Sequence, residues 1–151
     1  MSTSRIFQYV AKAAVEAGAT IVNDITGMQS QEMRELIADE HLECVIMHMQ
    51  GTPKTMQQNP HYENVVKEIS DFLAERIDLC ETDGVHPQHI IIDPGIGFGK
   101  TTQHNLEILR NLDKFKSLGK RLLIGASRKS FIGRILGSEE NPLPPEERLE
   151  G

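Results

Sequence analysis

A chain of 151 residues is long enough to bury one hydrophobic core. It is 38% hydrophobic and 25% charged, as globular proteins usually are, and its formal net charge of −6 is spread along the chain. This acidic balance argues against a protein that binds nucleic acid through a basic face. No apolar run approaches the roughly 20 residues that cross a bilayer, so we expect a cytoplasmic protein with neither nucleic acid nor membrane as a partner.

The predicted elements alternate between helical periodicity and short apolar runs. In chain order, the first half is predicted to hold a helix, a strand, a short helix, a second strand and a polar loop, over residues 7–17, 20–25, 31–40, 44–49 and 50–60. The second half is predicted to hold a helix, a strand, a helix, a strand and a short helix, over residues 62–80, 89–93, 106–118, 121–125 and 130–136. A further helix is expected to begin at Pro145.

Four short apolar strands separated by helices indicate a parallel sheet that is buried on both faces. The pattern alone allows a doubly wound open sheet or a (β/α)8 barrel. In either fold, chemistry is expected at the carboxyl ends of the strands, where Asn23, Asp93 and Ser127 lie. We expect a single domain over residues 1–151.

Two lone cysteines are present, Cys44 in a strand-like run and Cys80 near the end of a helix-like run. Cysteines in such apolar settings are more often reduced core residues than a disulfide pair in a protein of this kind.

The strongest local motif is Asp93-Pro94-Gly95-Ile96-Gly97-Phe98-Gly99-Lys100-Thr101, which follows a predicted strand. A Walker A loop needs one more residue between its first glycine and Gly-Lys, and a dinucleotide fingerprint needs a glycine at Lys100. Both nucleotide readings therefore fail on spacing. The motif places a carboxylate at a strand end, followed by a backbone that can pass close to a flat ligand because glycine has no Cβ.

Polar residues close two other strands. Of Asn23 and Asp24, one is expected to point into a central pocket and the other to cap the following turn. The segment Ser127-Arg128-Lys129-Ser130 suits an anionic or electron-rich ligand, although on this segment alone a solvated helix start is the better explanation.

The histidines are not predicted to bind a metal. His48 is expected inside the second strand as a hydrogen-bonded core residue. His86 and His89 have no cysteine or carboxylate at metal-ligand spacing.

Taken together, these segments resemble the dihydropteroate synthase family. The resemblance covers the chain from about Tyr9 onward and rests on four blocks: residues 21–27 (IVNDITG), 47–56 (MHMQGTPKTM), 92–100 (IDPGIGFGK) and 125–133 (GASRKSFIG). The first and third blocks would also fit the related pterin-binding methyltransferases, whereas the second and fourth favour the synthase.

The resemblance implies a partial (β/α)8 barrel in which these strands are about the fourth to the seventh. The other strands of such a barrel then lie outside this sequence, together with the magnesium-binding asparagine and the residues that hold the diphosphate. Mg2+ is accordingly implied as a cofactor with no ligand in this chain. A homodimer is implied for the full-length family member.

The resemblance also implies the site. Pterin-binding positions match Asn23, Ile25, Met47, Asp93, Gly125 and Lys129, and positions around the p-aminobenzoate site match Phe98, Ser127 and Arg128. Asp93 and Lys129 are the implied catalytic residues. The implied small-molecule substrates are a dihydropterin methyl diphosphate and p-aminobenzoate, which combine to dihydropteroate and pyrophosphate in folate biosynthesis, the step that sulfonamides block.

Two other hypotheses stay open at the level of the sequence. One is a non-catalytic pterin-binding or assembly segment, and the other is part of a corrinoid-linked methyltransferase. The Met-His-Met-Gln-Gly run at residues 47–51 and Ser-Arg-Lys at 127–129 favour the synthase over the methyltransferase.

Overall fold

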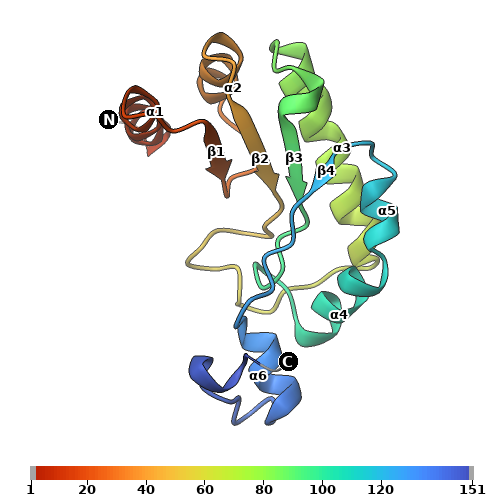
Figure 1. The fold of residues 1–151 in the computed structure, drawn as a ribbon. Coiled ribbons are helices and arrows are strands. Elements are labelled where there is room, and N and C mark those ends of the chain that lie inside the picture. Colours follow the sequence, from red (N-terminus) through yellow and green to blue (C-terminus); the bar gives the residue numbers. More distant parts are fainter. Residues whose placement is uncertain (1–2, 150–151) are drawn as a thin grey trace.

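The computed structural model describes residues 3–149, which form a parallel sheet with helices packed along it (Figure 1). The strands are β1 (Ile21–Asp24), β2 (Glu43–Met47), β3 (Ile90–Asp93) and β4 (Arg121–Leu122), in the spatial order β1-β2-β3-β4. Every neighbouring pair is parallel, so each connection crosses over through a helix. The carboxyl ends of all four strands therefore meet at one edge of the sheet.

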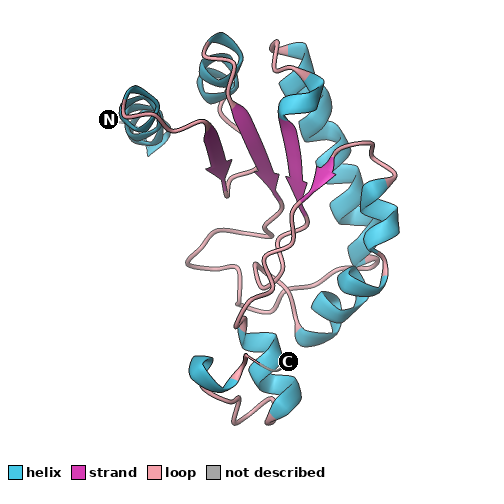
Figure 2. Ribbon diagram, in the orientation of Figure 1, coloured by secondary structure: helices cyan, strands magenta, loops and turns pink. Residues whose placement is uncertain are grey.

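The helices follow the strands in a regular alternation (Figure 2). They are α1 (Thr3–Glu16), α2 (Gln31–Asp39), α3 (Val65–Thr82), α4 (Thr102–Arg110), α5 (Leu112–Lys116) and α6 (Ser130–Leu136), with 3-10 turns at Pro87–His89 and Pro145–Glu147. Side-chain caps start three of them: Ser30 accepts from the N–H of Met33, Asn64 from that of Lys67, and Thr101 from that of His104. None of the helices between residues 3 and 149 is both long and apolar enough to cross a bilayer.

The two faces of the sheet have different surroundings. Side chains that point toward the helices form the core, and those of Cys44, Ile46, Ile90 and Ile92 are at most 1% exposed. They pack against buried residues of α2 and α3 such as Ile37 and Leu73. The opposite face carries the alternate residues, because successive strand side chains point to opposite sides. That second face does not join the core cluster.

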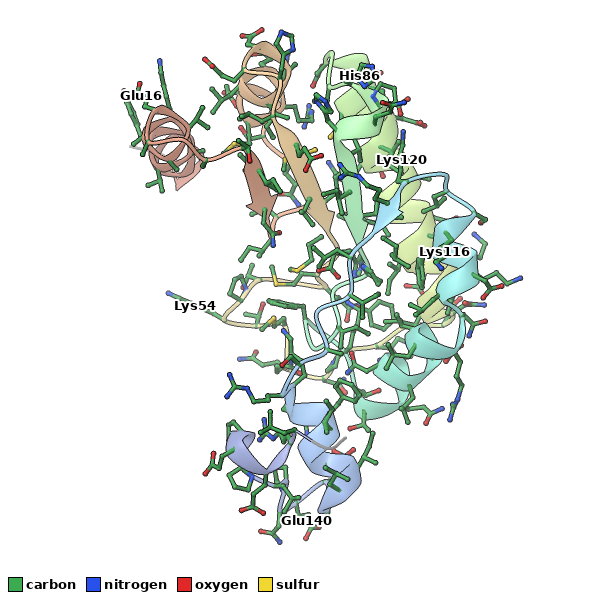
Figure 3. All side chains as sticks on the ribbon, in the orientation of Figure 1. Glu16, Lys54, His86, Lys116, Lys120 and Glu140 are labelled. Atoms are coloured by element: carbon green, nitrogen blue, oxygen red, sulfur yellow. The ribbon has the colours of Figure 1, made fainter. Side chains whose placement is uncertain are left out.

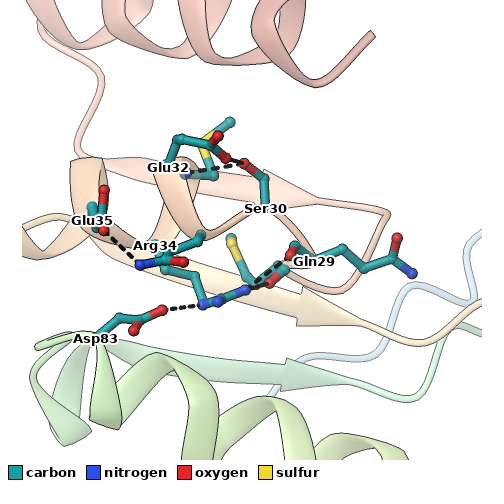
Figure 4. Close-up of polar contacts among 9 residues, drawn as sticks. Gln29, Ser30, Glu32, Arg34, Glu35 and Asp83 are labelled. Atoms are coloured by element: carbon teal, nitrogen blue, oxygen red, sulfur yellow. Dashed lines mark hydrogen bonds and ion pairs between the residues drawn. The ribbon is translucent and has the colours of Figure 1, made fainter. Parts of the chain in front are cut away.

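A buried arginine ties α2 to the end of α3 (Figure 4). Arg34 Nε lies 2.6 Å from a carboxylate oxygen of Asp83, and Arg34 Nη1 donates to the carbonyls of Met28 and Gln29 at 2.7 and 3.0 Å. A guanidinium with 7% of its residue exposed is thus paired and hydrogen-bonded, as a buried charge must be. These contacts also hold the turn that follows β1.

Four details differ from the sequence predictions. The sheet is not buried on both faces at its edge, since Ile21 of β1 is 48% exposed. Strand β2 ends at Met47, so His48 follows the strand instead of lying within it. The predicted helix over 106–118 is two helices, with Asn111 between them. The predicted strand over 121–125 has regular strand structure only at Arg121–Leu122.

Both cysteines are free and fully buried, as predicted. Cys44 of β2 and Cys80 of α3 face each other in the core, and the hydrogen bond with Cys80, together with burial, raises the pKa of the Cys44 thiol. Cys44 is thus a protonated core residue.

Candidate functional site

The sheet face away from the core gathers the predicted pterin residues of the first three strands. Asn23 pairs with Val45 across β1 and β2, and Val45 pairs with Ile91 of β3. Met47 pairs directly with Asp93. Since paired residues in a parallel sheet point the same way, Asn23, Met47 and Asp93 share this face, near its carboxyl edge. Asn23 and Asp93 are two strands and two residues apart in the sheet, about 12 Å.

Asp93 is a buried carboxyl group at the end of β3, with 6% of the residue exposed. Its Oδ1 accepts a 2.7 Å hydrogen bond from the N–H of Gly95. Burial raises the pKa of Asp93, and the Gly95 N–H and the charges of Lys100 and Lys129 act against that rise. The chain thus places a desolvated acid at the strand end and surrounds it with groups that favour its ionised form.

The loop after Asp93 packs tightly on the segment after β2. A Cβ on Gly95 would lie 1.9 Å from the carbonyl oxygen of His48, and one on Gly99 would lie 2.8 Å from that of Gln50. Both glycines also have positive φ, 72° and 63°. These glycines are therefore explained by close backbone approach, as the motif predicted, although the approach seen is to the protein's own backbone.

Phe98 and Lys129 meet over this loop. The Lys129 Nζ lies 4.2 Å from the centroid of the Phe98 ring, a cation–π contact. The side chain of Lys129 also crosses Gly97, where a Cβ would lie 3.1 Å from Lys129 Cδ. Lys129 therefore contacts the loop that begins at Asp93, and its charge acts on the Asp93 carboxylate, lowering its pKa against the effect of burial.

The other predicted site residues are more open. Ile25 is 37% exposed, and Asn23, Gly125, Ser127 and Arg128 are exposed as well. A Cβ on Gly125 would meet nothing within 4 Å, so packing inside residues 3–149 does not require glycine there. Their ligand roles stay predictions.

Of Asn23 and Asp24, it is Asp24 that caps the turn, as was predicted for one of the two. Asp24 lies on the opposite face from Asn23, and its carboxylate accepts hydrogen bonds from Thr26 N at 2.8 Å and Met28 N at 3.1 Å. It also accepts from the Thr26 hydroxyl. Asp24 therefore caps the turn, which leaves Asn23 to face the site.

His48 is a buried, hydrogen-bonded residue, as predicted, but sequence reasoning did not single out the buried lysine beside it. The Lys100 Nζ lies 3.0 Å from His48 Nδ1 and donates to the carbonyl of Phe98 at 2.9 Å. Lys100 is 1% exposed and His48 7% exposed. Lys100 belongs to the glycine-rich motif, so the sequence contained a signal for it. The burial of Lys100, however, depends on contact with His48, which lies 52 positions earlier.

Arg148 and Asn105 also support the site loops and were not predicted. Arg148 donates to the carbonyls of Leu143 at 2.7 Å and Arg128 at 3.1 Å, which holds Arg128 in a left-handed conformation with φ 52°. Asn105 accepts from the N–H of Gly97 at 2.8 Å and donates to the carbonyl of Thr101. Both are long-range or loop contacts that periodicity does not reveal.

Comparison with known proteins agrees with this arrangement. The family model described as "Pterin binding enzyme" matches residues 6–151. The chain belongs to this family. Among curated relatives, the dihydropteroate synthase of Synechocystis is 43% identical over 143 residues, and that of Escherichia coli K12 is 39% identical over 142 residues. Each match covers 94% of this chain but 48% and 49% of the relative, so the chain spans about half the length of the curated relatives it matches.

Solved structures of pterin-binding enzymes have the same fold. Dihydropteroate synthase from Thermus thermophilus, in complex with 6HMPPP, aligns with a TM-score of 0.85 at 39% identity, over 94% of this chain and 55% of that one. The enzyme from Xanthomonas albilineans, in complex with 7,8-dihydropteroate, aligns with a TM-score of 0.80 at 38% identity, over 91% of this chain and 48% of that one. The expected fold class, a partial (β/α)8 barrel, is confirmed.

The donor set near this site does not fit a protein-bound metal ion. Among residues 3–149, no three His, Cys, Asp or Glu side chains come together in a way that could hold one. Asp93 is committed to Gly95 and to neighbouring ammonium groups instead. The residues described here therefore do not offer a site for the Mg2+ that the resemblance implies.

Proposed function

We propose that this chain is the pterin-holding part of a dihydropteroate synthase. The observation that carries the proposal is that Lys129 and Phe98 meet over the loop that begins at Asp93, at the carboxyl edge of the sheet, in a chain of the pterin-binding family. The relatives from Synechocystis and E. coli favour the synthase over a corrinoid-linked methyltransferase.

In this proposal, Asp93 recognises the amino-pyrimidine edge of the pterin. A carboxylate can accept two parallel hydrogen bonds from a ring N–H and an exocyclic amine, and such charge-assisted pairs are short and strong. Asn23, on the same sheet face, would complete that edge, with Met47 and Ile25 as apolar walls. Lys129 would donate to the pterin carbonyl and ring nitrogen from the opposite side.

The second substrate would bind beside the Phe98 ring, near Ser127 and Arg128. The aromatic face of Phe98 suits the ring of p-aminobenzoate, and the Arg128 guanidinium suits its carboxylate. The amine nitrogen would then attack the methylene carbon of the pterin. The new C–N bond replaces the C–O bond to the diphosphate, which leaves with its electron pair, and the amine releases a proton to solvent. Holding both reactants in line is the chain's contribution to rate.

The proposal predicts that the chain binds pterin through Asp93. Calorimetric titration of the folded chain with 6-hydroxymethylpterin measures this, after circular dichroism has confirmed folding of each variant. Asp93→Ala should weaken binding by about 100-fold, since a buried charge-assisted bidentate contact is lost. Asp78→Ala, an exposed acid on α3, is the matched control and should bind as the wild type does.

Two outcomes of this titration separate the candidate functions. Unchanged affinity in Asp93→Ala contradicts the site. Binding without turnover, when the chain is mixed with the dihydropterin methyl diphosphate and p-aminobenzoate, favours a pterin-binding segment that needs further residues for synthesis. The half-length match to the relatives is the observation behind that second candidate.

A further inference from the structure

Lys100 is the most deeply buried charged side chain beside the proposed site, and no substrate contact accounts for it. It is 1% exposed and ends the glycine-rich loop that begins at Asp93. Three acceptors surround its Nζ: the carbonyl of Phe98 at 2.9 Å, His48 Nδ1 at 3.0 Å and the carbonyl of His48 at 3.4 Å. An ammonium group has three protons to donate, so the number of acceptors matches the charged form.

The neighbouring histidine is suited to accept from this ammonium. Burial and the charge of Lys100 lower the pKa of His48 to about 3, so its ring is neutral at physiological pH and can offer Nδ1 as an acceptor. Burial lowers the pKa of Lys100 to about 7, and the carboxylate of Asp93 acts in the opposite direction. Of the two side chains, Lys100 is therefore the one that gains or loses a proton near neutral pH, while His48 stays neutral.

The contacts of Lys100 join the two segments that carry the pterin site. His48 follows Met47 at the end of β2, and Phe98 lies in the loop after Asp93 at the end of β3. The tight approach of Gly95 to the His48 carbonyl occurs at the same place, where a Cβ would also lie 3.4 Å from Lys100 Nζ. Moving the lysine would release both segments at once.

We infer that Lys100 is a positioning residue of the pterin site. Its buried ammonium fastens the loop of residues 94–99 to the end of β2, through the carbonyl of Phe98 and Nδ1 of His48, and its charge favours the ionised form of Asp93 while the lysine is protonated. Because the ammonium of Lys100 already has His48 and Phe98 as acceptors, we expect it to act through the loop and not by contacting the substrate. The inference rests on the proposed function for its effect on pterin, whereas the contacts that fasten the loop do not depend on that function.

Other titratable groups face Lys100 and influence its pKa or are influenced by its charge. Asp93 comes from β3, His48 from the end of β2 and His104 from α4, and each interacts electrostatically with Lys100. The Tyr62 hydroxyl donates to the Gly99 carbonyl, and its ring packs on His48 and His104. Arg134 and Glu139 line the same cavity as Lys100 and lie 3.4 Å apart.

The first test needs no ligand. The carboxyl 13C shift of Asp93 is followed against pH in the full chain, in Lys100→Met and in Lys116→Met, whose lysine projects into solvent (Figure 3). We expect the pKa of Asp93 to rise in Lys100→Met, because the cation that opposes the burial effect is gone, and to stay unchanged in Lys116→Met. An unchanged Asp93 titration in Lys100→Met overturns the inference.

The second test uses 6-hydroxymethylpterin. At pH 6 we expect Lys100→Met to bind it roughly tenfold more weakly than Lys116→Met, the equivalent of about one pKa unit. Binding by Lys116→Met should then weaken as the pH rises through about 7, because a neutral Lys100 holds the loop at Phe98 and His48 less firmly, whereas Lys100→Met should show no step there. Titration of the pterin itself affects both variants alike. A shared step overturns the inference.

The outcomes keep the two proposals distinguishable. If neither the wild type nor Lys116→Met binds pterin, the proposed function fails, and the Asp93 titration still decides the role of Lys100. If Lys100→Met does not fold, Lys100→Gln replaces it, and the 15N shifts of His48 are measured in the wild type. An unprotonated Nδ1, with a second step of the Asp93 shift near pH 7, supports the inference; a protonated Nδ1 or no such step overturns it.

Discussion

The centre and the edges of the sheet differ in almost every property that matters for binding. On β2 and β3, Ile46 and Ile92 are fully buried, and the polar groups that follow them are fixed by hydrogen bonds from Lys100 and Gly95. On β1, Ile21 is 48% exposed, and β4 is paired over two residues. Preorganisation is thus concentrated in the middle of the sheet, where Asp93 lies.

This contrast explains why the candidate residues fall into two groups. Asp93, Phe98, Lys129 and Met47 are held by neighbours within residues 3–149, whereas Asn23, Ser127 and Arg128 are exposed at or beyond the edge strands. A strand with one paired neighbour leaves backbone groups for another strand to meet. The central group is therefore expected to recognise pterin, and the edge group to need further structure for its full effect.

A pair of isoleucine truncations tests the difference between the centre and the edge of the sheet most directly. Ile46→Ala on β2 should lower the free energy of unfolding by about 2–5 kcal/mol, because it leaves a cavity between the sheet and its helices. Ile21→Ala on β1 should cost under about 1 kcal/mol, since half of that side chain is already in water. Urea unfolding of the two variants measures the difference. Equal losses would show that the β1 edge is covered in solution.

The centre should also respond to acid more than the edges do. Because the pKa of His48 is lowered from 6.5 to about 3, the unfolded chain binds the His48 proton first as pH falls. The stability contributed by a neutral His48 is present above pH 6.5 and is lost progressively between pH 6.5 and 3. Asp93 acts in the opposite direction, since its raised pKa favours protonation of the folded state.

His48→Asn tests that assignment. The asparagine Oδ1 can accept from Lys100 as Nδ1 does, but it does not titrate. Unfolding midpoints measured between about pH 7 and 4 should decline less steeply in His48→Asn than in the wild type. His61→Asn, at an exposed position, is the control. Parallel declines in all three chains would remove His48 as the cause.

Sequence patterns predicted the alternation of helices and strands because each element has its own apolar period. They missed the start of α4 at Thr102, where Thr101 and His104 form a capping box with histidine in the place usual for Glu or Gln. They also missed the break at Asn111, whose side chain bonds back to the Glu107 carbonyl. Such ends depend on single side chains and not on periodicity.

The candidate site could be proposed from the sequence to the extent that its residues occur in contiguous motifs. Asp93, Phe98 and Lys129 lie within two such blocks, and the division of labour between Asn23 and Asp24 followed from strand alternation. Lys100, His48 and Arg148 gain their roles from contacts between distant segments. The positions of these residues depend on the register of β2 against β3 and on the path of the last loop. Local sequence patterns do not predict either of these.

The smallest predicted effect is at the β1 edge, where two adjacent residues should behave differently. Asp24→Ala should lower the free energy of unfolding by about 1 kcal/mol, because the turn loses its acceptor for the N–H groups of Thr26 and Met28. Asp24→Asn keeps an acceptor and should recover part of that loss.

Asn23→Ala, one position away, should change stability by less than about 0.5 kcal/mol, because its side chain is exposed. Pterin affinity should show the reverse order, weakened in Asn23→Ala and retained in Asp24→Ala. Thermal unfolding and calorimetric titration of the same three variants measure both properties. Weakened pterin binding in Asp24→Ala alone would mean that the turn, and not Asn23, carries the contribution of β1 to the site.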